Sequence, residues 1–163
     1  MLEKMDLTLE NLCIRTFIPE KDREALAAVH DPARHIELHL AGLDDAFLPL
    51  AVAAEREGLY DYKHLDVAEY KGSIVGFTAY DEEELAWCYV APAFHRKGIG
   101  KRLVMHALEK EPGICEVEAL EGNLPAKALY ESCGFHLEKM LHGKMPGNER
   151  FPVSVYLLTR EVR

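Results

Sequence analysis

The stretch that decides the fold is residues 90–101, which read Val90-Ala91-Pro92-Ala93-Phe94-His95-Arg96-Lys97-Gly98-Ile99-Gly100-Lys101. An apolar, strand-like pattern ends at Val90, a short loop follows, and a helical pattern opens across Gly98 and Gly100. The first N–H groups of a helix lack partners within the helix and carry a partial positive charge, so they bind phosphate oxygens. Glycine lets a ligand approach the backbone closely. The segment is therefore interpreted as a phosphate-binding turn, and a solvated basic turn is the plainer alternative.

Two common phosphate loops do not fit this segment. A Walker loop requires Ser or Thr after Gly-Lys and a glycine five positions earlier, where this chain has Arg102 and His95. A dinucleotide fingerprint requires a third glycine at the position of Leu103. These mismatches disfavour an unrelated mononucleotide-binding domain.

A second motif lies downstream, at Asn123-Leu124-Pro125-Ala126-Lys127-Ala128-Leu129-Tyr130-Glu131-Ser132-Cys133-Gly134-Phe135. Together, the two segments resemble the GCN5-related N-acetyltransferase (GNAT) superfamily. Its members carry Arg/Gln-x-x-Gly-x-Gly/Ala at a helix start and Asn-x-x-Ala-x-x-Leu/Phe-Tyr-x-x-x-Gly-Phe later. The second motif matches at every marked place, whereas His95 replaces the usual Arg or Gln of the first.

The resemblance implies acetyl-CoA as the cofactor, with no metal. In the family, the amides of the turn hold the pyrophosphate of coenzyme A, and the end of the preceding strand pairs with the pantetheine arm. Asn123 is also expected to contact the cofactor, although Asn is a favoured helix N-cap in any protein. The expected cofactor-binding residues are Cys88, Tyr89, Val90, His95, Arg96, Lys97, Gly98, Ile99, Gly100, Lys101 and Asn123.

The implied reaction is the transfer of an acetyl group to a primary amine by direct attack in a ternary complex. Tyr130 is expected to protonate the leaving thiolate, and without the resemblance it would be interpreted as a core aromatic. Two carboxylates are candidates for the base: Glu118, five residues before Asn123, and Glu84, fourteen residues before Gly98. The alternative interpretation is that both glutamates are ordinary surface residues of strands. A non-catalytic acyl-CoA-binding or sensing module is the alternative function.

The acceptor is expected to be a small-molecule or peptide amine, and no motif narrows this class. In the family, the first helices and the last loop flank the acceptor pocket. Here these segments are residues 31–63, with Phe47, Tyr60 and Tyr62, and residues 142–150.

The order of apolar patterns predicts an α/β (α+β) fold, and the resemblance implies a GNAT-like mixed, mostly antiparallel central sheet flanked by helices. Residues 1–163 are expected to form one acetyltransferase-like domain. Strands are predicted at 11–17, 65–70, 73–80, 85–90, 114–120, 135–141 and 151–159, and helices at 20–29, 98–110 and 124–133. The stretch 31–63 is predicted to be helical in parts, with breaks at Gly42, Pro49 and Gly58.

Composition limits the partners. The formal net charge of −9 disfavours nucleic acid, because phosphate backbones repel an acidic domain. The longest apolar run, residues 46–54, is too short to span a bilayer, and the N-terminus lacks the pattern of a signal peptide. The four cysteines form no Cys-x-x-Cys pair, so free thiols and a cytoplasmic location are expected. His35 and His39 do not fit the His-Glu-x-x-His pattern of a metalloprotease. A homodimer is left open.

Overall fold

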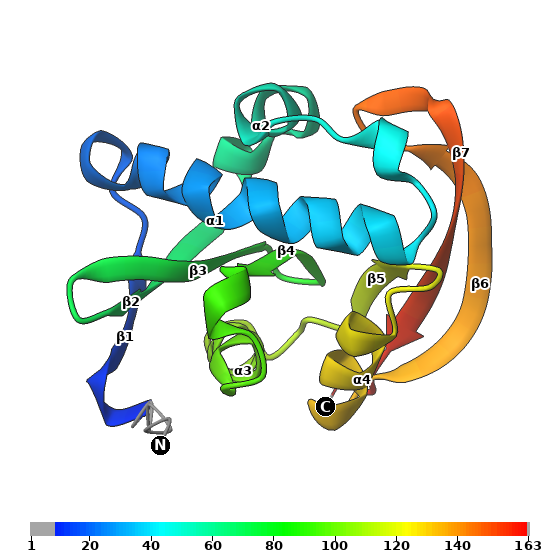
Figure 1. Cartoon of the computed structure of the whole chain (residues 1–163). Helices are drawn as coiled ribbons and strands as arrows, with labels where there is room; N and C mark the ends of the chain where they lie inside the picture. Colours follow the sequence, from blue (N-terminus) through cyan, green and yellow to red (C-terminus); the bar gives the residue numbers. More distant parts are fainter. Residues whose placement is uncertain (1–8, 163) are drawn as a thin grey trace, which may run out of the picture.

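The computed structural model describes residues 9–162 (Figure 1). Within this range one sheet forms in the order β1-β2-β3-β4-β5-β7-β6. Neighbouring strands are antiparallel, except that β4 and β5 are parallel. This arrangement confirms the predicted mixed, mostly antiparallel sheet. The strands are β1 Leu12–Thr16, β2 His64–Tyr70, β3 Ser73–Tyr80, β4 Glu84–Val90, β5 Glu116–Leu120, β6 His136–Met145 and β7 Asn148–Thr159.

Helices cover both faces of the sheet. Figure 1 shows α1 and α2 on one side, and α3 and α4 on the other. The apolar side chains of α1 and α2 pack with Phe77 and Trp87 of the sheet, whereas those of α3 and α4 pack with Leu85 and Val117. The helices are α1 Pro19–Leu40, α2 Leu50–Glu57, α3 Ile99–Lys110 and α4 Leu124–Ser132.

The first helix is longer than predicted. It runs 22 residues and passes through Pro32, whereas the sequence pattern predicted a helix at 20–29 followed by a stretch from residue 31 that is helical in parts. An interior proline costs a helix about 3 kcal/mol, and full burial of one large apolar side chain recovers about 1.5–3 kcal/mol. Burial therefore offsets the proline; the buried apolar residues of α1 are Leu26, Val29, Ala33 and Leu38. The three predicted breaks are confirmed, because α1 ends before Gly42 and α2 lies between Pro49 and Gly58.

The last two strands are also longer than predicted. The predicted loop over residues 142–150 is wrong, because the β6–β7 ladder continues to the pair of Met145 with Asn148. The turn is reduced to Pro146 and Gly147, and Gly147 has a φ of 75°, which favours glycine. Met145 is buried against Leu38, so the hairpin end is fixed over α1.

The parallel strands β4 and β5 separate after a short pairing. Their register contains only Glu84 with Glu116 and Leu85 with Val117. An irregularity in the β3–β4 register lies next to this point, because Ala79 is opposite Trp87 whereas Tyr80 is opposite Leu85. A bulge of this kind bends a strand and changes where its side chains point. The later half of β4 therefore has no strand along the edge that faces β5.

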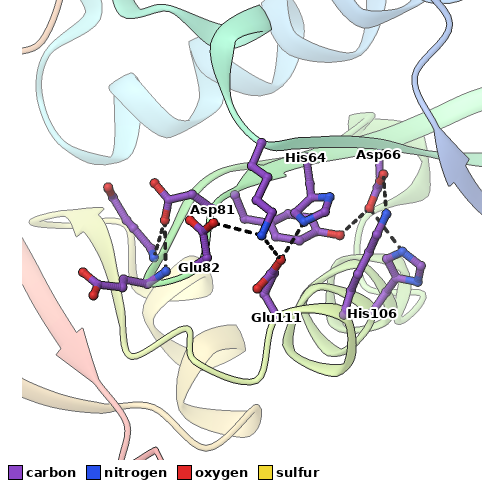
Figure 2. A network of polar contacts seen from close by, with 11 residues as sticks. His64, Asp66, Asp81, Glu82, His106 and Glu111 are labelled. Atoms are coloured by element: carbon purple, nitrogen blue, oxygen red, sulfur yellow. Dashed lines mark hydrogen bonds and ion pairs between the residues drawn. The ribbon is translucent and has the colours of Figure 1, made fainter.

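A polar network joins β2 to α3 on the face opposite α1 (Figure 2). Asp66 is 1% exposed and accepts hydrogen bonds from the Tyr80 hydroxyl at 2.5 Å and from His106 Nε2 at 3.2 Å. Lys110 Nζ lies 3.7 Å from the other Asp66 oxygen. A buried carboxylate is costly unless it is paired, so we interpret this network as structural.

Candidate active site

Two cavities open where β4 and β5 separate. The large cavity, about 520 Å³, lies between α1, the end of β4 and the starts of α3 and α4. The small cavity, about 160 Å³, lies on the α1 side and reaches α2, β5 and the β6–β7 hairpin. Four residues line both cavities: Glu37, Cys88, Tyr89 and Tyr130. The two cavities therefore meet beside these side chains.

The backbone at the start of α3 is shaped for an anion. Gly98 is the N-cap with a φ of 86°, and no side chain caps the helix, so its first N–H groups stay available. Arg96 also has a positive φ, of 61°, which orients the preceding loop. His95 Nε2 donates a hydrogen bond to the Val90 carbonyl at 2.7 Å and so ties this loop to the end of β4.

Asn123 and Tyr130 face the large cavity from α4. Asn123 is buried; its Oδ1 accepts from the Ala126 amide at 3.3 Å, and its Nδ2 donates to Glu37 at 3.1 Å. The side chain thus caps the helix and binds α1. Tyr130 is also buried, and its hydroxyl makes no hydrogen bond with the described residues. Burial raises the pKa of Tyr130 well above its usual value, so the hydroxyl stays protonated.

Glu37 is a site residue that the sequence did not reveal. Its Oε1 accepts from the Tyr89 hydroxyl at 2.9 Å and from the Arg34 guanidinium, and its Oε2 accepts from Asn123. The carboxylate therefore connects α1, β4 and the start of α4. No motif marks it, because its partners Tyr89 and Asn123 are 52 and 86 residues away in sequence.

The two candidate bases occupy different places. Glu118 lines the small cavity, and burial, followed by the charge of Glu116, raises its pKa. Glu84 lies at the joined end of β4 and β5, and it lines neither of these cavities. Burial, followed by the charge of Glu118, raises the pKa of Glu84.

Most of the predicted cofactor residues lie together. Lys97 and the three aromatic residues expected beside the acceptor, Phe47, Tyr60 and Tyr62, do not line either cavity. The predicted residues that line the large cavity are Cys88, Tyr89, Val90, His95, Arg96, Gly98, Ile99, Gly100, Lys101, Asn123 and Tyr130.

The acetyltransferase (GNAT) domain family matches residues 61–137, a range that contains both motifs. Residues 61–137 are therefore similar to a GNAT acetyltransferase domain.

Peptidyl-lysine N-acetyltransferase YiaC of Escherichia coli (strain K12) is 36% identical over 72 residues, which cover 44% of this chain and 49% of YiaC. The matched part thus spans about half the length of this curated relative. A GCN5-related N-acetyltransferase from Rhodopseudomonas palustris has the same fold, with a TM-score of 0.71 and 18% identity over 92% of this chain and 95% of that one. A ribosomal-protein-alanine N-acetyltransferase from Brucella melitensis gives a TM-score of 0.67 and 22% identity, over 93% of this chain and 99% of that one.

Within residues 9–162, no three His, Cys, Asp or Glu side chains are grouped to hold a metal ion. His35 stacks on Phe47, and His39 hydrogen-bonds Asp44, so the two histidines have separate surroundings. The helices of the same range include none that is long and apolar enough to cross a bilayer.

Proposed function

We propose that this protein is an N-acetyltransferase that moves an acetyl group from acetyl-CoA to a primary amine within a ternary complex. The observation that carries the proposal is the meeting of two cavities at Tyr130, next to the open end of β4. Two cavities that share one wall allow donor and acceptor to bind together, and direct attack requires this. The match of residues 61–137 to the GNAT domain family and the relative YiaC, named for the acetylation of peptidyl-lysine, support the same chemistry.

The residues around the large cavity fit coenzyme A. The uncapped start of α3 offers backbone N–H groups to a pyrophosphate, and Arg96 and Lys101 lie beside it. The edge of β4 without a strand partner, at residues 88–90, can pair with the extended pantetheine arm. Acetyl-CoA, when bound, supplies the thioester whose carbonyl carbon accepts the amine.

Each catalytic step has a candidate side chain. The Tyr130 hydroxyl donates a proton to the leaving sulfur, because burial keeps the hydroxyl protonated and it makes no hydrogen bond with the described residues. A backbone N–H between Cys88 and Val90 stabilises the developing negative charge on the carbonyl oxygen. Glu118 accepts the proton of the amine, directly or through water, because it lines the small cavity whereas Glu84 does not. Glu37 positions Tyr89 and Asn123 around the transfer point.

The experiment that tests this function has two stages. Acetyl-CoA at a hundredfold excess over its Kd should stabilise the protein by about 2.7 kcal/mol, and ATP should not. A panel of amines, monitored for released thiol, then separates an enzyme from a non-catalytic acyl-CoA-binding module.

The base is tested with two matched variants. Glu118→Gln should lower kcat with partial recovery at high pH, where more of the amine is already neutral, and Glu84→Gln should have the smaller effect. Equal stabilisation by ATP and acetyl-CoA, or binding without turnover of any amine, would contradict the proposal.

A further inference from the structure

The wall of the small cavity contains a carboxylate, that of Glu57, with no hydrogen bond or ion pair to the part of the chain that the structure describes. Glu57 ends α2 and packs against the β6–β7 turn, since a Cβ atom on Gly147 would lie 3.2 Å from Glu57 Cγ. Its carboxylate makes no hydrogen bond or ion pair with residues 9–162. The nearby guanidinium of Arg34 is already bound to Glu37, and its Nη2 lies 3.5 Å from Met145 Sδ. Arg34 therefore attracts Glu57 only at a distance, and no cation among residues 9–162 forms an ion pair with it.

The cavity as a whole has an excess of negative charge. Its lining includes three carboxylates and one guanidinium. His30 adds no positive charge, because burial lowers its pKa and keeps the ring neutral. The charged lining residues are Arg34, Glu37, Glu57 and Glu118. Burial, together with the charge of Glu37, raises the pKa of Glu57 to about 7. A bound cation would relieve this unfavourable environment.

The surface around these carboxylates suits a methylene chain. Trp87, Tyr89 and the ring of His30 form an aromatic part of the wall, and rings of this kind also attract ammonium groups. A volume of about 160 Å³ equals the space of about five water molecules at ~30 Å³ each, so it accommodates a short aliphatic chain. The aliphatic part of the wall consists of Leu48, Leu120, Val153 and Val155.

We propose that the acceptor is an aliphatic diamine or longer polyamine, whose distal ammonium is bound by Glu57 while its other amine lies beside Glu118 and Tyr130. This inference rests on the proposed acetyltransferase function. The attacking nitrogen forms a bond to the acetyl carbon as the carbon–sulfur bond breaks. Glu118 receives a proton from the nitrogen, and the sulfur receives one from Tyr130. The distal ammonium keeps its proton throughout and only anchors the substrate.

The test compares three acceptors of matched chemistry: 1,4-diaminobutane, n-butylamine and a peptide with one lysine and an acetylated N-terminus. The kcat/KM for the diamine should exceed that for the monoamine by about tenfold or more, a typical gain from one charge-assisted contact. Glu57→Gln keeps the shape of the side chain and removes its charge, and it should reduce this ratio about tenfold. Glu55→Gln is the matched control, because Glu55 is an exposed residue of the same helix outside the cavity lining, and it should leave the ratio unchanged.

A binding measurement separates this inference from the proposed function. Calorimetry with protein saturated by coenzyme A should detect 1,4-diaminobutane with the wild-type protein, and at least about tenfold weaker binding with Glu57→Gln. Equal kcat/KM values for diamine and monoamine, or a clear preference for the lysine peptide, would overturn the diamine assignment and leave the acetyltransferase function standing. If no amine reacts at all, the proposed function fails. Diamine binding that survives in the Glu57→Gln variant would overturn the role of Glu57.

Discussion

The stability of the protein should depend on pH through Glu57, and this prediction requires no ligand. Glu57 is half-buried at the end of α2. The charged groups that act on it are Arg34 and Glu37 from α1 and Glu149 from β7. Burial, followed by the repulsion of the two glutamates, exceeds the attraction of Arg34, so the pKa rises from 4.5 to about 7. Glu57→Gln removes this titration with little change in shape.

The sign of the effect follows from the direction of the shift. The folded protein holds the Glu57 proton more tightly than the unfolded chain, so wild-type protein loses stability as the pH rises from about 4.5 to about 7. The full difference, from 4.5 to about 7, would correspond to at most about 3.4 kcal/mol, at about 1.36 kcal/mol for each pH unit. Water reaches this half-buried carboxylate and screens it, so we expect about 1–2 kcal/mol.

Thermal unfolding of the two proteins between pH 4.5 and pH 8 measures this difference. The Tm values should coincide near pH 4.5, and at pH 8 the Glu57→Gln variant should be higher by about 2–8 °C, the usual scale for a chain of this size. Glu55→Gln should follow the wild-type curve at every pH, because that side chain is exposed. A Glu57→Gln curve parallel to the wild-type curve over the whole range would refute this account of Glu57.

Two further predictions concern the large cavity and the transfer point. Gly98→Asp should weaken acetyl-CoA binding by about 100-fold or more in calorimetry, because it adds negative charge to a phosphate site at a φ of 86°. His95→Gln should change this affinity by less than about threefold, since an amide can also donate to the Val90 carbonyl; the reverse order would contradict the backbone cradle. Tyr130→Phe keeps the buried ring and should lower kcat about 100-fold with little change in acetyl-CoA affinity. Wild-type kcat in this variant would remove Tyr130 from the mechanism.

The sequence predicted the part of the fold that local patterns encode. The β2–β3 hairpin, the α3 start at the glycines and the α4 cap at Asn123 each depend on residues close together in the chain. Two elements are longer than predicted, the helix over residues 19–40 and the strand pair over residues 142–150, and they have a common cause. In both places burial against a distant segment extends the element beyond its local pattern: α1 packs on the sheet, and Met145 packs on Leu38.

The same distinction explains why the acceptor side of the site was not visible in the sequence. The family match covers residues 61–137, which contain β4, α3 and α4 and hence the backbone around the large cavity. Glu37 and Glu57 lie before this range, and Met145 and Val153 lie after it, although all four line the small cavity. Their positions depend on the placement of α1, α2 and the β6–β7 hairpin, which share no local motif. A family motif therefore predicts the proposed acyl donor, whereas the amine that we propose depends on charges that only the folded chain brings together.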